Sequence, residues 1–435
     1  MAKKIKLGTT KLEELHEVLD LPEEILETKK SRLFPIGNTE QERATVSIFL
    51  ASLSAVKEYR EELFVSLNIK KITNNNVNIH TYVEIQGGNE NDRPDGLIVI
   101  TSGKNTPIIE WIGFVEAKIG ENILCDNQIE RYIDFANEIG IKDIITISNY
   151  LVTTPFDTPI TTKKRSFNLF HWSWEYLRVI ASRLIKNNAV ADEDHIYMLN
   201  ELQIYLTSHR NLRGFINMGS EWKDSVNTIQ GYNKEQKIKQ DILDAIIDPI
   251  IQEEKDISLR LTDTTGYLVE LMFKNDRKSE VIEMLQNEKI ITSQYSLNGD
   301  KKNTFCISID FIRQEIQCYK EVLIDKGQAK SQTTQLIKML EQNGGYSENI
   351  FINAIYNRNK SIEKDTVTLA DLIIEKNKGV PFYSNLNKDF GDTVKYFEIK
   401  TKDQLGKRFQ GTKTFIDDIE GFSERFIEQV MMNLK

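Results

Sequence analysis

The chain has 435 residues, of which 40% are hydrophobic, and it carries a formal net charge of −9 with a sequence pI of about 5.4. This composition excludes a disordered chain, and no apolar stretch approaches the roughly 20 residues that a membrane-spanning helix needs. The length predicts two or three domains. The absence of a Cys-x-x-Cys pair argues against a zinc site or a disulfide framework and predicts a protein of the reducing cytoplasm. The three cysteines are Cys125, Cys306 and Cys318.

Residues 1–32 predict a short helical lead-in, and residues 33–190 predict an α/β domain in which helices and strands alternate. The first helix of this domain should follow Thr39, because Glu42 stands three residues after it in the spacing of a capping box. An apolar helical run over 46–56 comes next. In this interpretation Glu42 caps the helix.

Two successive apolar segments, 93–100 and 110–118, predict neighbouring strands that are buried on both faces. Asp95 stands at the start of the first segment, and Glu116 and Lys118 end the second. Residues two apart in a strand share a face, so the carboxylate of Glu116 and the ammonium of Lys118 should reach into the same space.

A Glu-x-Lys triplet is common and most often belongs to a solvated strand face. The apolar flanks favour a different interpretation, because charges at the end of a buried strand are costly unless they are paired or used. Mg²⁺ typically takes one or two carboxylates together with waters and substrate phosphate. Asp95 and Glu116 therefore predict a Mg²⁺ or Mn²⁺ site that faces a phosphodiester, with the carbonyl of Ala117 approachable beside it.

The residues after the second strand predict a helix that begins with Asp126 or Asn127 as its N-cap and ends near Gly140. Gln128 and Tyr132 are four residues apart, so they share a face of this helix. The apolar run over 142–148 predicts another buried strand, which makes a strand–helix–strand unit with a parallel crossover.

In their order and spelling these segments resemble the core of the PD-(D/E)xK nuclease superfamily, which has the restriction-endonuclease-like fold. Pro94-Asp95 and Glu116-Ala117-Lys118 match its defining motif letter by letter. Gln128-x-x-x-Tyr132 resembles the helix signature of the RecB-type branch of that superfamily. The segment 166–174 resembles the late strand of the family, and the whole resemblance spans residues 79–175.

The resemblance implies an α/β fold whose mixed central sheet is flanked by helices. It also implies an acidic metal ligand on the first helix, for which Glu40 and Glu42 are the candidates. Glu42 is preferred over Glu40, and its alternative role is a plain helix cap. The implied ligands of Mg²⁺ or Mn²⁺ are Asp95, Glu116, the carbonyl of Ala117, and Glu42. The implied catalytic residues are Asp95, Glu116, Lys118, Gln128 and Tyr132.

Residues 191–435 predict a mainly helical α+β region. Its patterns include a helix over 234–247 that Pro249 ends, a strand over 259–274 and a helix over 311–323. No motif in this half carries chemistry, so partner docking or oligomerisation is its expected role.

The sequence thus predicts a Mg²⁺-dependent DNA nuclease, and the alternative is a catalytically inactive protein of the same fold that binds or scaffolds. A net charge of −9 repels a polyanion at long range, so DNA should meet a local basic patch or be delivered within a homo-oligomer or a multi-protein complex. Analogy at the level of the fold suggests an effector of a bacterial restriction or anti-phage system. No membrane partner is expected.

Overall fold

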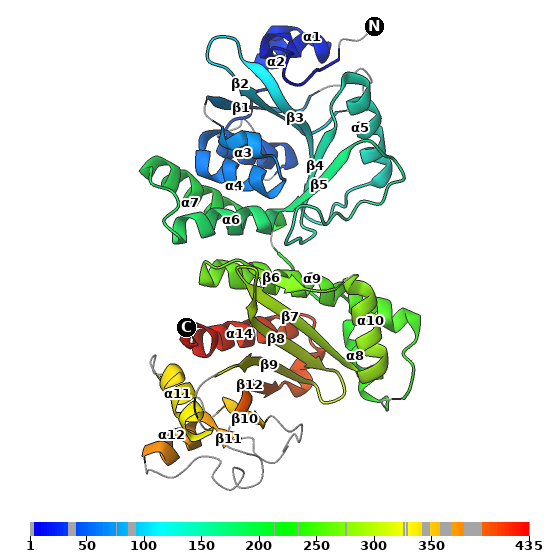
Figure 1. Ribbon diagram of the computed structural model, residues 1–435. Coiled ribbons are helices and arrows are strands. Elements are labelled where there is room, and N and C mark those ends of the chain that lie inside the picture. Colours follow the sequence, from blue (N-terminus) through cyan, green and yellow to red (C-terminus); the bar gives the residue numbers. More distant parts are fainter. Residues whose placement is uncertain are drawn as a thin grey trace. The chain divides into compact units, whose positions relative to one another are not determined.

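The computed structural model describes residues 4–33, 41–74, 76–85, 93–212, 214–233, 235–274, 276–324, 327, 329–341, 349–356, 367–377 and 394–434. The chain forms two compact units, Met1–Phe215 and Ile216–Lys435 (Figure 1). Each unit is built on its own β-sheet, so the fold is α/β with one mixed sheet and one antiparallel sheet.

The first unit contains a five-stranded mixed sheet with the strand order β1-β2-β3-β4-β5. The first three strands are antiparallel neighbours, whereas β3 with β4 and β4 with β5 are parallel pairs. The helix between β3 and β4 is the crossover that such a parallel pair requires. The strands are β1 (Val77–Val83), β2 (Gly96–Ser102), β3 (Ile108–Ala117), β4 (Asp143–Ser148) and β5 (Asn168–Ser173).

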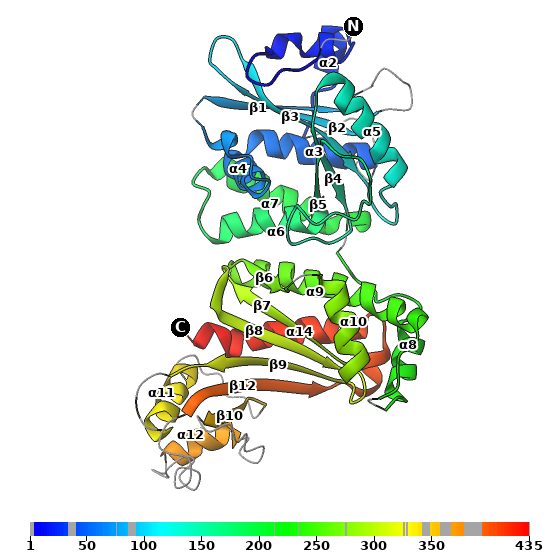
Figure 2. The ribbon, with the colours of Figure 1, turned by 45° about the vertical axis from the view of Figure 1, so that its right-hand side comes forward.

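Helices cover both faces of this sheet (Figures 1 and 2). The apolar side of α5 packs with Leu97, Val99 and Phe114 in one buried cluster, to which the two short N-terminal helices add leucines. Helix α3 packs on the opposite face, against β1 and β2. The helices of this unit are α1 (Leu15–Val18), α2 (Glu23–Thr28), α3 (Glu42–Ala55), α4 (Lys57–Ser66), α5 (Asp126–Ile139), α6 (Trp174–Lys186) and α7 (Glu193–Ser208). Short 3-10 turns lie at Leu12–Glu14, Lys70–Thr73 and Arg210–Leu212.

Helix α7 lies in the first unit, whereas the sequence analysis ended the first domain at residue 190. Its Tyr205 hydroxyl lies 2.8 Å from the Thr45 hydroxyl on α3, and its His195 lies 2.8 Å from the carboxylate of Glu58 on α4. These contacts join α7 to the first two long helices of the unit, and no local sequence pattern reports such long-range contacts.

The second unit contains a seven-stranded antiparallel sheet with the order β11-β10-β12-β9-β8-β7-β6 (Figure 2). Tyr295 on β7 stacks on Phe305 of β8, which in turn meets Phe426, so α14 covers this face of the sheet. The strands are β6 (Val269–Met272), β7 (Ile290–Leu297), β8 (Asp300–Asp310), β9 (Glu315–Val322), β10 (Phe351–Tyr356), β11 (Val367–Thr368) and β12 (Val394–Gln404). The helices are α8 (Trp222–Gln230), α9 (Gln240–Thr265), α10 (Arg277–Glu288), α11 (Ala329–Glu341), α12 (Leu369–Asn377) and α14 (Thr414–Gln429), with 3-10 turns at Gly406–Gln410 and Met431–Asn433.

Three predicted elements of this unit were wrong. Helix α9 continues through Pro249 to Thr265, so the strand predicted over 259–274 shrinks to β6. Apolar residues on both sides of the proline are buried, and this packing outweighs the local penalty that proline imposes on a helix. The helix predicted over 311–323 is largely strand β9, whose buried side chains alternate. A short apolar run fits either period, and pairing with β8 and β12 decides for the strand.

Among the described helices, none combines the length and the apolar character that crossing a bilayer demands.

Candidate metal centre

Asp95 and Glu116 lie next to each other where β2 begins and β3 ends. The antiparallel register pairs Gly96 with Val115, and one further step brings Asp95 opposite Glu116. The Oδ2 atom of Asp95 accepts the backbone N–H of Ala117 at 2.9 Å, which fixes the carboxylate at the end of β3. The side chain of Asp95 is 23% exposed, whereas that of Glu116 is only 2% exposed.

The ammonium of Lys118 lies among the carboxylates, as the shared strand face predicts. Its Nζ donates to Glu116 Oε1 at 2.5 Å and to the carbonyl of Ala117 at 2.9 Å, and it lies 4.0 Å from Asp95 Oδ2. The backbone of Lys118 is also held, because its N–H donates to Ile147 on β4 at 2.8 Å and its carbonyl accepts the indole N–H of Trp174 at 2.9 Å. The lysine is therefore fixed at both its backbone and its side chain.

Glu42 reaches the same place from α3. One of its oxygens accepts from Lys118 Nζ at 3.3 Å, and the other accepts the N–H of Ile119 at 3.3 Å. The predicted capping box has the wrong register, because α3 begins at Glu42 with Gln41 as its N-cap. The carboxylate of Glu42 therefore contacts the residues that follow β3 instead of capping its own helix. Thr39 and Glu40 lie outside the described residues, so the choice between Glu40 and Glu42 stays a prediction.

Gln128 and Tyr132 extend the cluster from α5. The amide of Gln128 donates to Glu116 Oε1 at 2.8 Å and to the Tyr132 hydroxyl at 2.9 Å, and that hydroxyl donates to the carbonyl of Arg93 at 3.1 Å. Helix α5 ends at Gly140, whose φ of 86° is left-handed as its position predicts, but its N-cap is Cys125. Two donors, Gln128 and Lys118, thus hold the same oxygen of Glu116.

Burial dominates the electrostatics of the cluster. Burial, together with the nearby charge of Asp95, raises the pKa of Glu116 to about 8. Burial also raises the pKa of Asp95 above its ordinary value. Burial alone would lower the pKa of Lys118, but the attraction of Glu116, Asp95 and Glu42 outweighs it, and the net pKa is raised. The pKa of Tyr132 is raised by burial and by Glu116.

One carboxylate oxygen of this cluster has no partner. Glu116 Oε2 is buried and accepts no hydrogen bond within the described part of the chain. Buried polar atoms are nearly always hydrogen-bonded, so an orphaned oxygen points to an absent ligand. Together with Asp95 and the Ala117 carbonyl it forms an all-oxygen donor set, which fits a hard divalent cation such as Mg²⁺ or Mn²⁺. Glu42 faces Lys118 instead, so its role as a metal ligand stays a prediction.

Sequence reasoning missed two arginines beside the cluster. Arg43, which follows Glu42, and Arg93, two residues before Asp95, both lie 2.9 Å from the carboxylate of Glu84. Their side chains are 63% and 46% exposed. A basic residue within two positions of each of two candidate ligands was the available signal. Lys164, which precedes β5, forms an ion pair with Asp134 on α5.

Any functional assignment rests on the residues described above, because comparison with known proteins found no relative. No protein-family model, no curated protein and no solved structure matches the chain.

Proposed function

We propose that the first unit is a nuclease that uses Mg²⁺ or Mn²⁺ to hydrolyse phosphodiester bonds in DNA. The observation that carries this proposal is the buried Glu116, which contacts Lys118 and keeps one oxygen unpartnered beside Asp95. The spelling of these residues in the PD-(D/E)xK pattern and the mixed order of the strands support the same conclusion.

Each side chain has a distinct task in this proposal. Asp95 and Glu116 bind the divalent ion, which when bound polarises the scissile phosphate and lowers the pKa of an attacking water. Lys118 stabilises the negative charge that develops on the phosphoryl oxygens. Because its pKa is raised, Lys118 stays protonated at neutral pH, so it acts as a cation and hydrogen-bond donor and does not remove a proton from water.

Gln128 and Tyr132 keep Glu116 in position. The Gln128 amide holds Oε1 of Glu116, and this leaves the unpartnered Oε2 as the atom that would bind an ion. Tyr132 in turn fixes the Gln128 amide and is itself anchored to the carbonyl of Arg93, two residues before Asp95. The pair therefore links both ligand-bearing strands through α5.

A net charge of −9 repels DNA at long range, and Arg43 and Arg93 supply local positive charge beside the candidate site. Both side chains are exposed, and each stands within two residues of a candidate ligand, Glu42 or Asp95. Each offers a charge-assisted contact to a phosphate beside the scissile one. Local positive charge of this kind contributes to DNA affinity even on an acidic protein, because the field of distant charges is screened at physiological salt.

The test is cleavage of a supercoiled plasmid with Mg²⁺, with Mn²⁺ and with EDTA. We expect metal-dependent cleavage by the wild type and a loss of about 10²–10³-fold in Lys118→Met, which keeps the stem and removes the charge. Lys71→Met is the matched control, because Lys71 pairs with Glu110 on the same sheet at 2.8 Å outside the cluster. Equal rates for Lys118→Met and the control would refute the proposal.

One observation favours the inactive alternative. Lys118 donates to Glu116, Ala117 and Glu42 at once, which is also how a structural counter-ion behaves. If the protein is a scaffold, the wild type cleaves no DNA with any of the metals, and Lys118→Met has a lower melting temperature than the wild type. The nuclease proposal predicts cleavage by the wild type, so the same pair of proteins decides between them.

A further inference from the structure

The second unit holds a group of three buried carboxylates. Glu253 and Asp256 are nearly one turn apart on α9, and Glu420 lies on α14, which packs against α9. One oxygen from each residue lies within 4.8 Å of the others. The three residues are only 1%, 8% and 7% exposed. In this part of the chain the sequence analysis found no chemistry.

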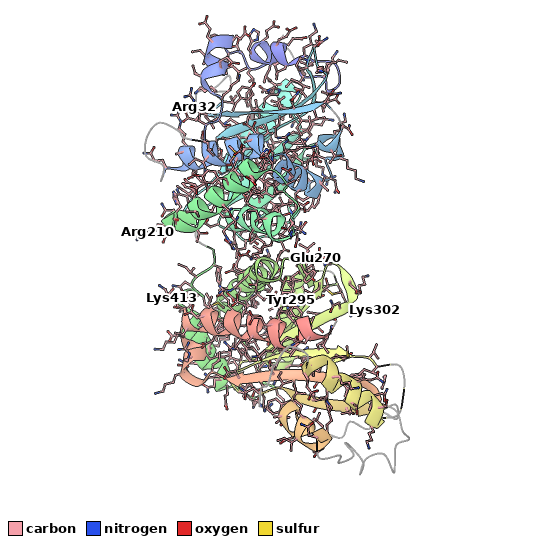
Figure 3. The ribbon with its side chains drawn as sticks, turned by 90° about the vertical axis from the view of Figure 1, so that its left-hand side faces the viewer. Arg32, Arg210, Glu270, Tyr295, Lys302 and Lys413 are labelled. Atoms are coloured by element: carbon pink, nitrogen blue, oxygen red, sulfur yellow. The ribbon has the colours of Figure 1, made fainter. Side chains whose placement is uncertain are left out.

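Glu253 has no hydrogen-bond partner for either carboxylate oxygen among the described residues. The next residue, Glu254, is equally buried, but its carboxylate accepts from Arg277 at 2.9 Å and from Ser293 at 2.6 Å. Tyr295, labelled in Figure 3, also donates to the backbone carbonyl of Glu254, at 3.2 Å. Two adjacent buried glutamates thus differ sharply: one is hydrogen-bonded by the protein, and the other lies beside the carboxylates of Asp256 and Glu420 without a hydrogen bond of its own.

The arginine nearest in sequence, Arg260, does not supply the missing partner. Its guanidinium donates to Glu420 at 2.8 Å and to Glu424 at 2.7 Å, and its side chain is 46% exposed. A carboxylate that is buried without a hydrogen bond is strongly disfavoured unless a cation is bound to it. The unpartnered Glu253 therefore provides evidence for a ligand that is independent of the clustering itself.

We propose that Glu253, Asp256 and Glu420 bind one divalent cation that joins α9 to α14. Three carboxylates form a hard, all-oxygen donor set. Because the residues are buried, the site leaves little room for the several waters that Mg²⁺ retains, and this favours Ca²⁺, which carboxylates bind in either mono- or bidentate fashion. The role is structural, because the ion ties the helix that covers the sheet to the long helix beside it.

The site is separate from the centre in the first unit, and the experiment keeps the two apart. All measurements use the full chain carrying Asp95→Asn, which removes a ligand of the first centre. The protein is stripped with EDTA, dialysed against Ca²⁺ and then against metal-free buffer, and its metal content is measured by mass spectrometry. We expect one equivalent of Ca²⁺ in this background, and its complete loss when Glu253→Gln is added.

Glu424→Gln is the matched control, because it removes a carboxylate from the same face of α14 outside the group of three. This variant should retain the equivalent of Ca²⁺, and its melting temperature should rise with added Ca²⁺, whereas Glu253→Gln should show no such rise. Calorimetric titration of Ca²⁺ into the stripped Asp95→Asn protein needs no further variant, and should show one site. If the protein retains no Ca²⁺ and the titration shows no heat of binding, the proposal is overturned. Protons would then neutralise the buried carboxylates. Binding of Mn²⁺ without Ca²⁺ would overturn the choice of ion.

Discussion

Replacing Glu116 by glutamine should stabilise the metal-free protein at alkaline pH. Burial raises the pKa of Glu116 from 4.5 to about 8. Between those two values the unfolded chain releases the proton while the folded protein keeps it, so stability falls as the pH rises through this window, and the loss is complete above about pH 8. Glutamine has the same shape as the protonated acid, and it removes this loss.

The magnitude follows from the two pKa values. At about 1.36 kcal/mol for each pH unit, the difference corresponds to roughly 5 kcal/mol. This figure is an upper bound, because side-chain rearrangement and water relieve part of the burial cost. We expect Glu116→Gln to exceed the wild type by about 2 kcal/mol or more at pH 9, and by less than about 1 kcal/mol at pH 5.

The assay is urea unfolding in EDTA, followed by tryptophan fluorescence across pH 5–9. Three of the four tryptophans, Trp111, Trp172 and Trp174, lie in the first unit, so the signal mainly reports that unit. Mg²⁺ at 100 times its Kd should offset about 2.7 kcal/mol of the difference in stability, because it stabilises the wild type alone. If Glu116→Gln is the less stable protein at pH 9 in EDTA, then pairing with Lys118 outweighs burial and the reasoning is wrong.

Three further outcomes are expected. Tyr132→Phe should lower the cleavage rate by about 3–10-fold at unchanged stability, since it removes the hydroxyl that fixes Gln128; a wild-type rate would make Tyr132 a core aromatic only. Arg93→Gln and Arg43→Gln should each weaken DNA binding irrespective of sequence and reduce the slope of log affinity against log salt by about one, as measured by fluorescence anisotropy; unchanged slopes would exclude phosphate contacts. Cleavage per molecule should rise with protein concentration alongside the mass in solution, because assembly aligns several sites; a monomer with constant, rapid cleavage of duplex DNA would contradict this.

Local signals in the sequence predicted much of the first unit. The apolar runs gave β2, β3 and β4, and Gly140 marked the end of α5. Strand parity placed Glu116 and Lys118 together, and the spacing of Gln128 and Tyr132 placed them on one helix face. These inferences succeeded because each depends on the geometry of a single element.

Contacts between distant segments were beyond such reasoning. Glu84 meets Arg43 and Arg93, and Glu253 meets Glu420, only because packing brings separate elements together. The start of α3 was misplaced since the capping pattern at Thr39 has the same local appearance whether or not a helix begins there. Sequence motifs indicated which residue types lie at the end of β3. They did not indicate that the Lys118 ammonium donates hydrogen bonds to Glu42, Glu116 and the carbonyl of Ala117.

The hydrogen bond from the indole of Trp174 to Lys118 can form only late in the synthesis of the chain. Trp174 donates to the carbonyl of Lys118 across 56 residues of chain, and Glu42 reaches Lys118 across 76. Closing such loops is slow, and the N-terminal part of a chain emerges from the ribosome first. The candidate site residues Asp95, Glu116 and Lys118 therefore emerge before β4 and α6, which hold the backbone of Lys118. A nascent chain thus carries these side chains in an unassembled form. Under the proposed nuclease function, a fragment that stops short of α6 lacks the contact of Trp174 to Lys118 and is expected to leave nucleic acids uncut.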